Sequence, residues 1–286
     1  MKFVEFLQEY DIPFCREGAH HHCRTGWIQI DCPFCGKNSH KWHMGYSLSG
    51  RFCSCWRCGF HPLVEVLSEL TGLSFRQVYR QIEDILPERA LVKKTKGKLI
   101  IPKGVSTLQS PHKKYLRGRN FNWRRIEKQW EIGGVGIASK IAWSIFIPIH
   151  YRGEVVSWTS RSLSDKGARY ISASESEESL PHKSLLYGED FATHSIIVVE
   201  GPTDVWRIGC GAVATLGVGY SPAQVSKILK YPRRAVCFDK GAQKRAKKLV
   251  DTLCLYPGET YNMVLEADDP GSAGQKEIKQ IREFLK

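Results

Sequence analysis

Acidic side chains follow three apolar runs in the C-terminal third of the sequence. In chain order, these acids are Glu200, Asp204, Asp239, Asp268 and Asp269. Open parallel sheets place their sites at the carboxyl ends of strands, so we expect the acids to converge on one crevice. Clustered carboxylates repel one another unless cations neutralise them, and Mg²⁺ or Mn²⁺ with bound phosphates does that. The pattern predicts nucleotidyl transfer or phosphodiester cleavage, in which metal clamps the attacking and leaving oxygens.

Each acid also has an ordinary structural interpretation. Glu200 and Asp204 could favour the positive end of a helix that starts near Pro202. Asp239 could cap the following helix, and the Asp-Asp pair at 268–269 could lie in a turn. A single shared site explains all of these positions at once, and we adopt it.

A second group of reactive side chains has the spacing of a metal site. Cys32 and Cys35 form one CxxC knuckle, and Cys55 and Cys58 form another after 19 intervening residues. Two knuckles at this separation can bring four thiolates to the corners of a tetrahedron, the geometry that Zn²⁺ takes in closed structural sites. We therefore expect one structural zinc ion.

The identity of the four ligands stays open at this point. Cys53, His40, His43 and His61 flank the knuckles, so a Cys₃His set is an alternative, although Cys53 is most simply a buried small hydrophobe. The run at 20–22 is three histidines, which do not share one face of a helix or strand. We interpret it as a polar loop that contacts phosphate or substrate rather than a second metal site.

Basic and aromatic residues alternate between the two knuckles. Lys41 and Trp42 begin this stretch, which ends with Arg51 and Phe52. In an edge sheet, aromatic rings can stack on unpaired bases while cations hold phosphates. Ordinary packing of the aromatic rings against the ribbon is the alternative.

The composition favours a polyanionic partner. The chain has 286 residues, and 42 Lys and Arg against 29 Asp and Glu give a net charge of +13 and an isoelectric point near 9.3. Such a chain attracts nucleic acid. No run of about 18 apolar residues occurs, and the N-terminus lacks the apolar core of a signal peptide, so we expect a cytoplasmic protein without a membrane partner. Seven of the ten cysteines lie within 15–58, which favours metal binding over oxidation.

Changes in composition and in residue pattern divide the chain into four parts. We expect a zinc-ribbon DNA-binding domain at 1–90, a basic linker at 91–103 that acts as a flexible tether, and a basic α+β subdomain at 104–190. From 191 to 286, strands and helices alternate at short spacing, which predicts a mostly parallel, Rossmann-like sheet with helices on its faces. The expected fold class is multidomain, α+β and α/β.

Several elements can be placed within these parts. Apolar spacing and end signals predict helices at 62–70 and 74–86, and a basic helical segment at Tyr115–Trp130. Strands are expected at Trp143–Ile149 and Glu154–Thr159, separated by Arg152-Gly153.

The sequence resembles the bacterial-type (DnaG-like) DNA primases, most closely the short primases of phages and plasmids. The resemblance covers nearly the whole chain and includes the four CxxC cysteines. Glu200-Gly201-Pro202-Thr203-Asp204 is similar to the first motif of the TOPRIM fold. The middle region contributes Tyr115–Arg119, Ile147–Ile149, Gly153, Val156–Trp158, Arg161, Tyr170-Ile171, Lys183 and Leu186–Gly188.

This resemblance implies a nucleotidyltransferase that makes short RNA primers from ribonucleoside triphosphates on single-stranded DNA. The zinc domain of such enzymes selects the initiation sequence. The implied catalytic acids are Glu200, Asp204, Asp239 and Asp269, of which Glu200, Asp239 and Asp269 would hold Mg²⁺ or Mn²⁺. The implied contacts to template, nucleotide or primer are Arg161, Lys183, Arg117, Arg119, Lys41 and Trp42.

The sequence departs from the family pattern at two motifs. The second motif is usually Asp-x-Asp, but Asp239 is followed by Lys240 and Gly241. The third often has another acid two residues on, but Gly271 stands there; Glu266 or Asp268 could substitute. A TOPRIM nuclease and a non-catalytic single-strand-binding protein are therefore the alternative functions. No GxxxxGK[ST] loop is present, so we expect a replicative helicase to act in trans.

Overall fold

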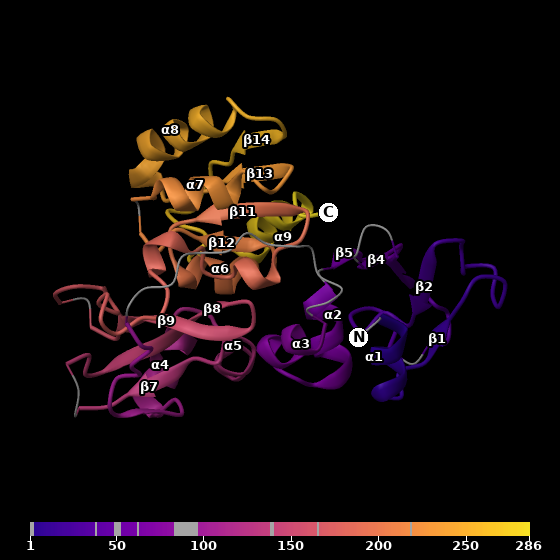
Figure 1. Ribbon diagram of the computed structural model, residues 1–286, viewed down its shortest axis with the longest axis horizontal. Coiled ribbons are helices and arrows are strands. Elements are labelled where there is room, and N and C mark those ends of the chain that lie inside the picture. The colour runs from indigo at the N-terminus through magenta and orange to yellow at the C-terminus, as the bar shows by residue number, and fades with distance from the viewer. Residues whose placement is uncertain are drawn as a thin grey trace.

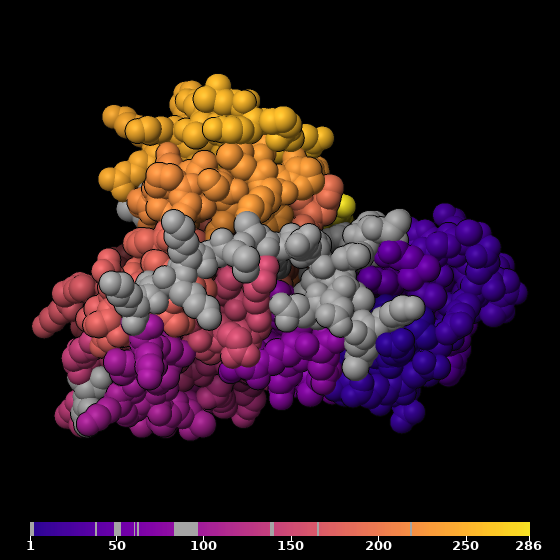
Figure 2. All heavy atoms as spheres, in the orientation of Figure 1, coloured from indigo at the N-terminus to yellow at the C-terminus, as the bar shows by residue number. Residues whose placement is uncertain are grey.

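Three sheets organise the chain. The computed structural model describes residues 3–37, 39–48, 53–61, 63–82, 97–137, 140–164, 166–217 and 219–286. The N-terminal sheet forms a lobe to one side of the other two sheets, which lie one above the other (Figures 1 and 2). The mixture of antiparallel and parallel sheets confirms the predicted fold class.

The N-terminal lobe contains five short antiparallel strands, paired in chain order. They are β1 (Phe14–Cys15), β2 (Trp27–Ile30), β3 (Met44–Ser47), β4 (Cys53–Cys55) and β5 (Gly59–His61). Helix α1 (Phe3–Glu9) covers the sheet, and the ring of Phe3 stacks on Tyr46 at 3.9 Å. All four residues of β3 are buried, so Tyr46 belongs to the core and offers no ring to a base.

Two helices complete this lobe. Helix α2 (Leu63–Thr71) and helix α3 (Phe75–Ile82) lie where the sequence predicts helices. Residues 83–96, which include the predicted end of the second helix, lie outside the described residues.

Two cysteines of the lobe differ from expectation. We expected metal binding rather than oxidation, but Cys15 and Cys23 form a disulfide, with their Cα atoms 6.4 Å apart. The chain turns back after β1, which brings the two residues within bonding reach. The expectation was wrong for this pair, whereas the four CxxC cysteines are free thiols.

The second sheet is antiparallel and follows the order β10-β9-β8-β7-β6. Its strands are β6 (Val105–Ser106), β7 (Gly133–Val135), β8 (Ser144–Tyr151), β9 (Glu154–Ser162) and β10 (Tyr170–Ser172). Arg152 and Gly153 join β8 to β9 with φ values of 54° and 74°. Left-handed backbone at both central residues is what a type I′ hairpin turn needs, which explains the tight pairing of these two strands.

The basic segment before these strands is two helices rather than one. Helix α4 (Ser110–Gly118) ends before Asn120, which has a φ of 58°, and helix α5 (Trp123–Trp130) begins after Asn122. The side chain of Asn122 accepts a hydrogen bond from the backbone N–H of Arg125 at 3.3 Å. The prediction of one helix over Tyr115–Trp130 was wrong, because this N-cap starts a new helix within it.

The third sheet is parallel and follows the order β12-β11-β13-β14. The strands are β11 (Ser195–Val199), β12 (Ala212–Ala214), β13 (Arg233–Val236) and β14 (Glu259–Asn262). The helices are α6 (Pro202–Ile208), α7 (Pro222–Ile228), α8 (Gln243–Leu253) and α9 (Gln275–Glu283), and short 3-10 turns lie at His182–Ser184, Glu189–Phe191 and Lys240–Ala242. The predicted alternation of strands and helices is confirmed.

The described part of the expected linker is not a free tether. The backbone N–H of Ile100 donates to the carbonyl of Glu177 at 3.0 Å, and the carbonyl of Ile100 accepts from the indole of Trp158 at 2.9 Å. Leu99 packs against the hydrophobic cluster that contains Trp158 and Phe146. Ile100 thus contacts β9 and the segment around Glu177 through its backbone, while the side chains of Ile100 and Ile101 remain 53% and 42% exposed. Residues 91–96 lie outside the described part, so the linker bounds stay a prediction.

The N-terminal lobe, called the zinc lobe below because it holds the four CxxC cysteines, shares one apolar core with the two other sheets. Phe75 of α3 contacts Trp130 and Phe191, with ring centroids 5.6 Å and 4.9 Å apart. The lobe is therefore packed against the second sheet and its helices. None of the helices in the described residues has the length and apolar character needed to cross a membrane.

Candidate active site and metal centre

Four carboxylates face one cavity beyond the carboxyl end of the parallel sheet. Glu200 directly follows β11, and Asp204 lies in the first turn of α6. Asp239 comes three residues after β13, and Asp269 lies in the loop between β14 and α9. All four line a cavity of about 280 Å³. The fold thus brings together acids that are separated by up to 69 residues in the sequence.

The carboxylates in this cavity strongly influence one another. Burial, followed by the charge of Asp239, raises the pKa of Glu200 and that of Asp204 to about 7 each. Burial and the charge of Asp269 raise the pKa of Asp239 to about 6. Each pKa shift reflects the free-energy cost of holding negative charges close together in a partly buried site. A bound cation would remove this cost.

Asp239 supplies a direct test of whether a cation fits. Its Oδ1 is buried and accepts no hydrogen bond from any described residue, and its side chain does not cap the turn that follows it. The backbone N–H of Asp239 donates to Glu200 Oε1 at 3.1 Å, which holds the two carboxylates side by side. A buried, unpaired carboxylate oxygen is costly. The donor set consists of oxygens, which suits Mg²⁺ or Mn²⁺.

Asp204 both caps helix α6 and holds a loop of the cavity in place. Its Oδ2 accepts from the backbone N–H of Gly201 at 2.9 Å, and its Oδ1 accepts from the backbone N–H of Gly271 at 3.1 Å. The first bond caps α6, as the ordinary interpretation expected. The second ties α6 to the loop that carries Asp269, so Asp204 positions its neighbour.

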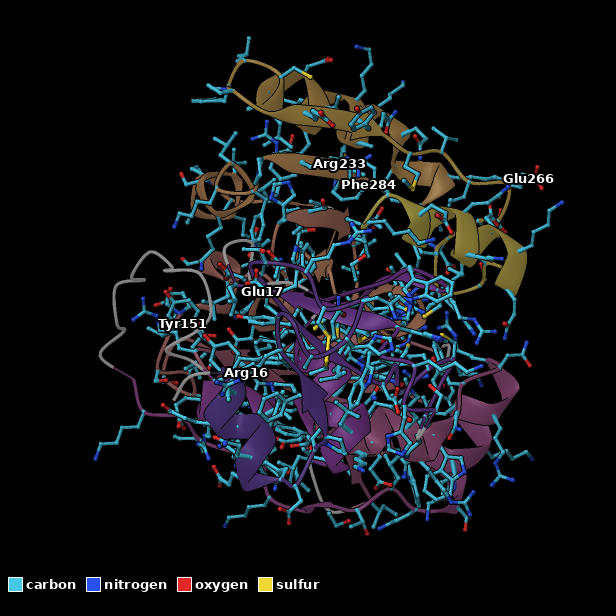
Figure 3. The ribbon with its side chains drawn as sticks, turned by 90° about the vertical axis from the view of Figure 1, so that its right-hand side faces the viewer. Arg16, Glu17, Tyr151, Arg233, Glu266 and Phe284 are labelled. Atoms are coloured by element: carbon cyan, nitrogen blue, oxygen red, sulfur yellow. A yellow bond between two sulfur atoms is a disulfide. The ribbon has the colours of Figure 1, made fainter. Side chains whose placement is uncertain are left out.

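The loop after β14 presents one of its acids to the cavity. Asp269 lines the cavity, whereas the side chain of Asp268 is 90% exposed and lies 3.7 Å from the ammonium of Lys240. Glu266 is exposed and points away from the body of the protein (Figure 3). The geometry therefore selects Asp269 among the three acids of this loop.

Cations line the other side of the cavity. Arg161 is buried, donates from Nε to the hydroxyl of Tyr115 at 3.0 Å, and has its guanidinium 4.9 Å from the centre of the Tyr170 ring. Arg119 and Arg169 also line the cavity. Sequence reasoning missed Arg169; its place one residue before the quoted Tyr170 was the available signal.

Two predicted cations lie elsewhere. Lys183 donates to the carbonyl of Leu216 at 2.6 Å, so it borders the cavity without lining it. Arg117 donates to the carbonyl of Lys113 in its own helix at 3.3 Å and does not reach the cavity.

The CxxC cysteines form a compact cluster. Cys32 Sγ lies 3.4 Å from Cys58 Sγ, and Cys35 Sγ lies 3.6 Å from Cys55 Sγ. A tetrahedral Zn²⁺ with Zn–S bonds of about 2.3 Å has sulfurs roughly 3.8 Å apart, so the four thiols fit such an ion. His61 Nε2 lies 3.2 Å from Cys58 Sγ, beside the four-sulfur group rather than in place of a sulfur.

Comparison with known proteins gives the fold a family context. No protein-family model matches the chain. A DNA primase of Borreliella burgdorferi (strain ATCC 35210 / DSM 4680 / CIP 102532 / B31) is 36% identical over an alignment of 91 residues, which covers 28% of this chain and 17% of that protein. The match therefore spans less than a fifth of that relative.

Solved structures extend the likeness. A DnaG primase catalytic domain bound to single-stranded DNA superposes with a TM-score of 0.52 at 19% identity, covering 62% of this chain and 70% of that one. The chain is DnaG-like in fold. The E. coli primase catalytic core (TM-score 0.52, 17% identity, 61% and 72% coverage) and a DNA primase domain from Pseudomonas aeruginosa (0.51, 22%, 60% and 70%) are similar in the same way.

The zinc lobe of this DnaG-like chain carries a second cavity, of about 410 Å³. Trp27 and Trp56 line it, and two buried polar atoms, Gln29 Oε1 and His43 Nδ1, have no hydrogen-bond partner among the described residues. Sequence reasoning missed these residues and favoured Lys41 and Trp42, neither of which lines this cavity. The alternation of Trp27 and Gln29 with isoleucines along β2 was the available signal.

The three adjacent histidines also differ from expectation. We expected that neighbours in sequence would not converge, but nitrogens of His20, His21 and His22 all lie within 4.8 Å of one another. They occupy turns and bends rather than a helix or strand, so the argument from regular geometry does not apply. Together with Lys41 they line a shallow depression beside the tryptophan cavity.

Proposed function

We propose that this chain is a DNA primase that synthesises short RNA primers on single-stranded DNA for DNA replication. The observation that carries the proposal is the cavity in which four carboxylates face three arginines, in a chain with a DnaG-like fold. Acids for metal and arginines for phosphate in one cavity match the needs of nucleotidyl transfer.

In this proposal the parallel sheet is a TOPRIM domain, and its acids are the metal site. Glu200, Asp239 and Asp269 hold Mg²⁺ or Mn²⁺, and Asp204 braces the loop of Asp269. The bound ion supplies Lewis-acid activation of the attacking hydroxyl and of the transferred phosphate. The second motif lacks an acid at Gly241, so Asp239 is the one carboxylate that this motif supplies to the cavity. The ammonium of Lys240 lies 3.7 Å from Asp268, and Lys240 does not line the cavity, so its charge does not occupy the metal site.

The reaction joins two ribonucleotides on a template. The 3′-hydroxyl of one attacks the α-phosphate of the next, an O–P bond forms, and pyrophosphate leaves with the electron pair of the broken O–P bond. Arg119, Arg161 and Arg169 bind the negative phosphate oxygens opposite the acids. Tyr115 and Tyr170 hold Arg161 in place, so this guanidinium is preorganised.

The N-terminal lobe supplies template contacts. Zn²⁺ on the four CxxC cysteines is structural, since the four sulfurs fill all four positions of a tetrahedron. The tryptophan cavity of the ribbon can stack a base between aromatic faces, and Lys41 borders it with a positive charge. A replicative helicase that acts in trans is the expected protein partner.

Incorporation of labelled ribonucleotides tests the proposal. On single-stranded DNA with Mg²⁺ or Mn²⁺, we expect short template-dependent products from the wild type. Glu200→Gln should reduce incorporation by at least about 100-fold, as loss of a metal-binding charge does. Glu266→Gln is the matched control, because Glu266 is exposed and lies outside the cavity.

The same assay separates the alternatives. Cys55→Ser should remove zinc, measured by metal analysis, and should abolish priming. Cleavage of the labelled template without incorporation would instead identify a TOPRIM-type nuclease. Single-strand binding without either reaction would contradict the enzymatic proposal and indicate a binding protein.

A further inference from the structure

A cleft of about 750 Å³ separates the zinc lobe from the parallel-sheet domain. One wall is a face of α9 and the residues after it. The other wall comes from α5, α6 and the zinc lobe. The charged and zinc-knuckle residues that line the cleft are Lys276, Lys279, Arg282, Glu283, Lys286, Arg125, Arg207, Glu65, Cys58 and His61.

The cleft is strongly positive. Six of its lining residues are Lys or Arg and two are acidic. Glu65 lies 3.4 Å from both Arg125 and Arg282, and Glu283 forms an ion pair with Lys286. Lys276 and Lys279 are exposed and have no acidic partner in the described part of the chain, so their charges face the cleft without compensation.

The spacing of the α9 cations suits an extended polyanion. Lys276, Lys279, Arg282 and Lys286 follow one another at intervals of three, three and four residues, and all four line the cleft. Lys276 to Arg282 spans about 9 Å of α9 at about 1.5 Å per residue, and Lys286 lies three residues past the end of the helix. The helical part alone matches the backbone of about three stacked nucleotides at roughly 3.4 Å each.

One end of the cleft is linked through hydrogen bonds to the acidic cavity, the cavity lined by Glu200, Asp204, Asp239 and Asp269. Arg207 donates from Nε and Nη2 to the carbonyl of Gly271, at 3.1 Å and 2.9 Å. The N–H of Gly271 in turn donates to Asp204. A phosphate beside Arg207 would therefore lie next to the loop that carries Asp269.

The other end of the cleft reaches the zinc knuckle. Cys58 and His61 line it there, and Lys286 lies against Gly59, where an added Cβ would come within 2.8 Å of Lys286 Cε. Figure 1 shows the C-terminus close to β5. Figure 3 shows Phe284 beside Arg233, whose guanidinium lies 4.5 Å from the Phe284 ring, so the end of α9 sits at the start of β13.

We infer that this cleft binds the phosphodiester backbone of a single nucleic-acid strand that runs between the zinc ribbon and the acidic cavity. The inference rests on the proposed function in taking a nucleic-acid strand as ligand. It adds a site on α9, away from the arginines of the acidic cavity. The strand is template DNA or primer RNA, which share this backbone chemistry.

Salt-dependent binding tests the inference with the zinc-loaded full chain, without nucleotides or added Mg²⁺. Affinity for labelled single-stranded DNA and RNA of one sequence is measured by fluorescence anisotropy over a range of salt. The test variant is Lys276→Gln with Lys279→Gln. The control, Lys230→Gln with Lys248→Gln, removes the same charge from exposed lysines of the same domain that do not line the cleft.

We expect the test variant to bind several-fold more weakly. The negative slope of log K against log salt should become shallower by about 1.4, as expected for two lost phosphate contacts. A larger effect on DNA identifies the template as the strand, and a larger effect on RNA identifies the primer. Equal slopes in wild type and test variant, or equal losses in test and control variants, would overturn the inference.

A competition experiment keeps the outcomes separate. Competition by inorganic tripolyphosphate that weakens in the test variant, with unchanged oligonucleotide binding, would show that the cleft takes nucleotide phosphates, and this would contradict the inference. Because binding is measured without catalysis, absent ribonucleotide incorporation would count against the proposed function alone.

Discussion

At the residue scale, the carboxylates of the acidic cavity repel one another unless a bound cation neutralises them. The raised pKa values of Glu200, Asp204 and Asp239 mean that the folded chain holds more protons than the unfolded chain between about pH 4 and pH 7. Without a divalent cation, stability therefore falls as pH rises through this window. A bound cation reverses the effect, because it favours the ionised acids.

This argument predicts a pH-dependent response to magnesium. Millimolar Mg²⁺ should raise the melting temperature of the zinc-loaded chain by several degrees at pH 8 and hardly at all at pH 5. Calorimetry or thermal shift measures both. Glu200→Gln should shrink the gain at pH 8, and an equal gain at the two pH values would contradict the assignment of these acids.

A second prediction concerns the positioning role of Asp204. Asp204→Asn places an amide N–H₂ against one of two backbone N–H donors, from Gly201 or Gly271, so one hydrogen bond is lost. We expect a loss of about 1 to 3 kcal/mol in the free energy of unfolding and at least about 10-fold in incorporation, since the loop of Asp269 shifts. Asp268→Asn, in the same loop but exposed, should leave both quantities near those of the wild type. Steady-state kinetics and urea unfolding provide the comparison.

At the scale of elements, one carboxylate adds polar contacts to the apolar packing between the zinc lobe and the second sheet. Glu131, just past α5, accepts from Ser74 at 2.9 Å and lies 3.3 Å from both Arg76 and His150. Burial alone would raise the pKa of Glu131, but its hydrogen bonds from His150 and Ser74 and its charged neighbours hold it at about 2. The carboxylate thus links α3 to β8 in its ionised form.

The sign of this shift gives a prediction for the interface. A depressed pKa contributes stability above the unfolded value of about 4.5, and that stability is lost as pH falls toward 2. Glu131→Gln should cost about 1 to 2 kcal/mol at pH 7, below the full linkage value because the carboxylate is partly solvated. In urea titrations the difference from wild type should shrink at pH 3. Glu154→Gln, which alters a more exposed partner of Arg76, should cost under about 0.5 kcal/mol.

At the scale of the whole molecule, Glu65 connects all three parts. It belongs to α2 of the zinc lobe, its side chain is 7% exposed, and it pairs with Arg125 of α5 and Arg282 of α9. The same carboxylate therefore lines the positive cleft and connects the lobe to both other parts of the molecule. A neutral group here would leave two arginines facing each other.

We expect Glu65→Gln to loosen the docked lobe by about 1 to 2 kcal/mol, since both arginine partners are half-exposed. Hydrogen exchange should quicken in α2 and α9, and small-angle scattering should give a larger radius of gyration. Glu69→Gln changes an exposed acid of the same helix and should alter neither. Unchanged exchange in Glu65→Gln would show that apolar packing, such as the contact between Phe75 and Trp130, is enough to hold the lobe in place.

Much of the architecture could be predicted because it depends on neighbours in sequence. CxxC spacing brings two thiolates together wherever the chain turns, so the clustering of Cys32 and Cys35 with the second knuckle follows from local geometry. Apolar runs that alternate with helical periods predict a parallel sheet, and acids that end such runs must lie at one edge of it. The convergence of Glu200 and Asp239 was predictable for that reason.

The remaining features depend on contacts between distant segments, which no local pattern specifies. The packing of the loop after β14 determines that Asp269 rather than Asp268 faces the cavity. The packing of α4 determines that Arg119 reaches the cavity while Arg117 does not. The tryptophan cavity, the contact of Ile100 with β9 and the positive cleft along α9 also arise where separate segments meet. The hydrophobic periodicity of a sequence determines on which face of a helix or strand a residue lies. Only tertiary packing determines which other residues that face contacts.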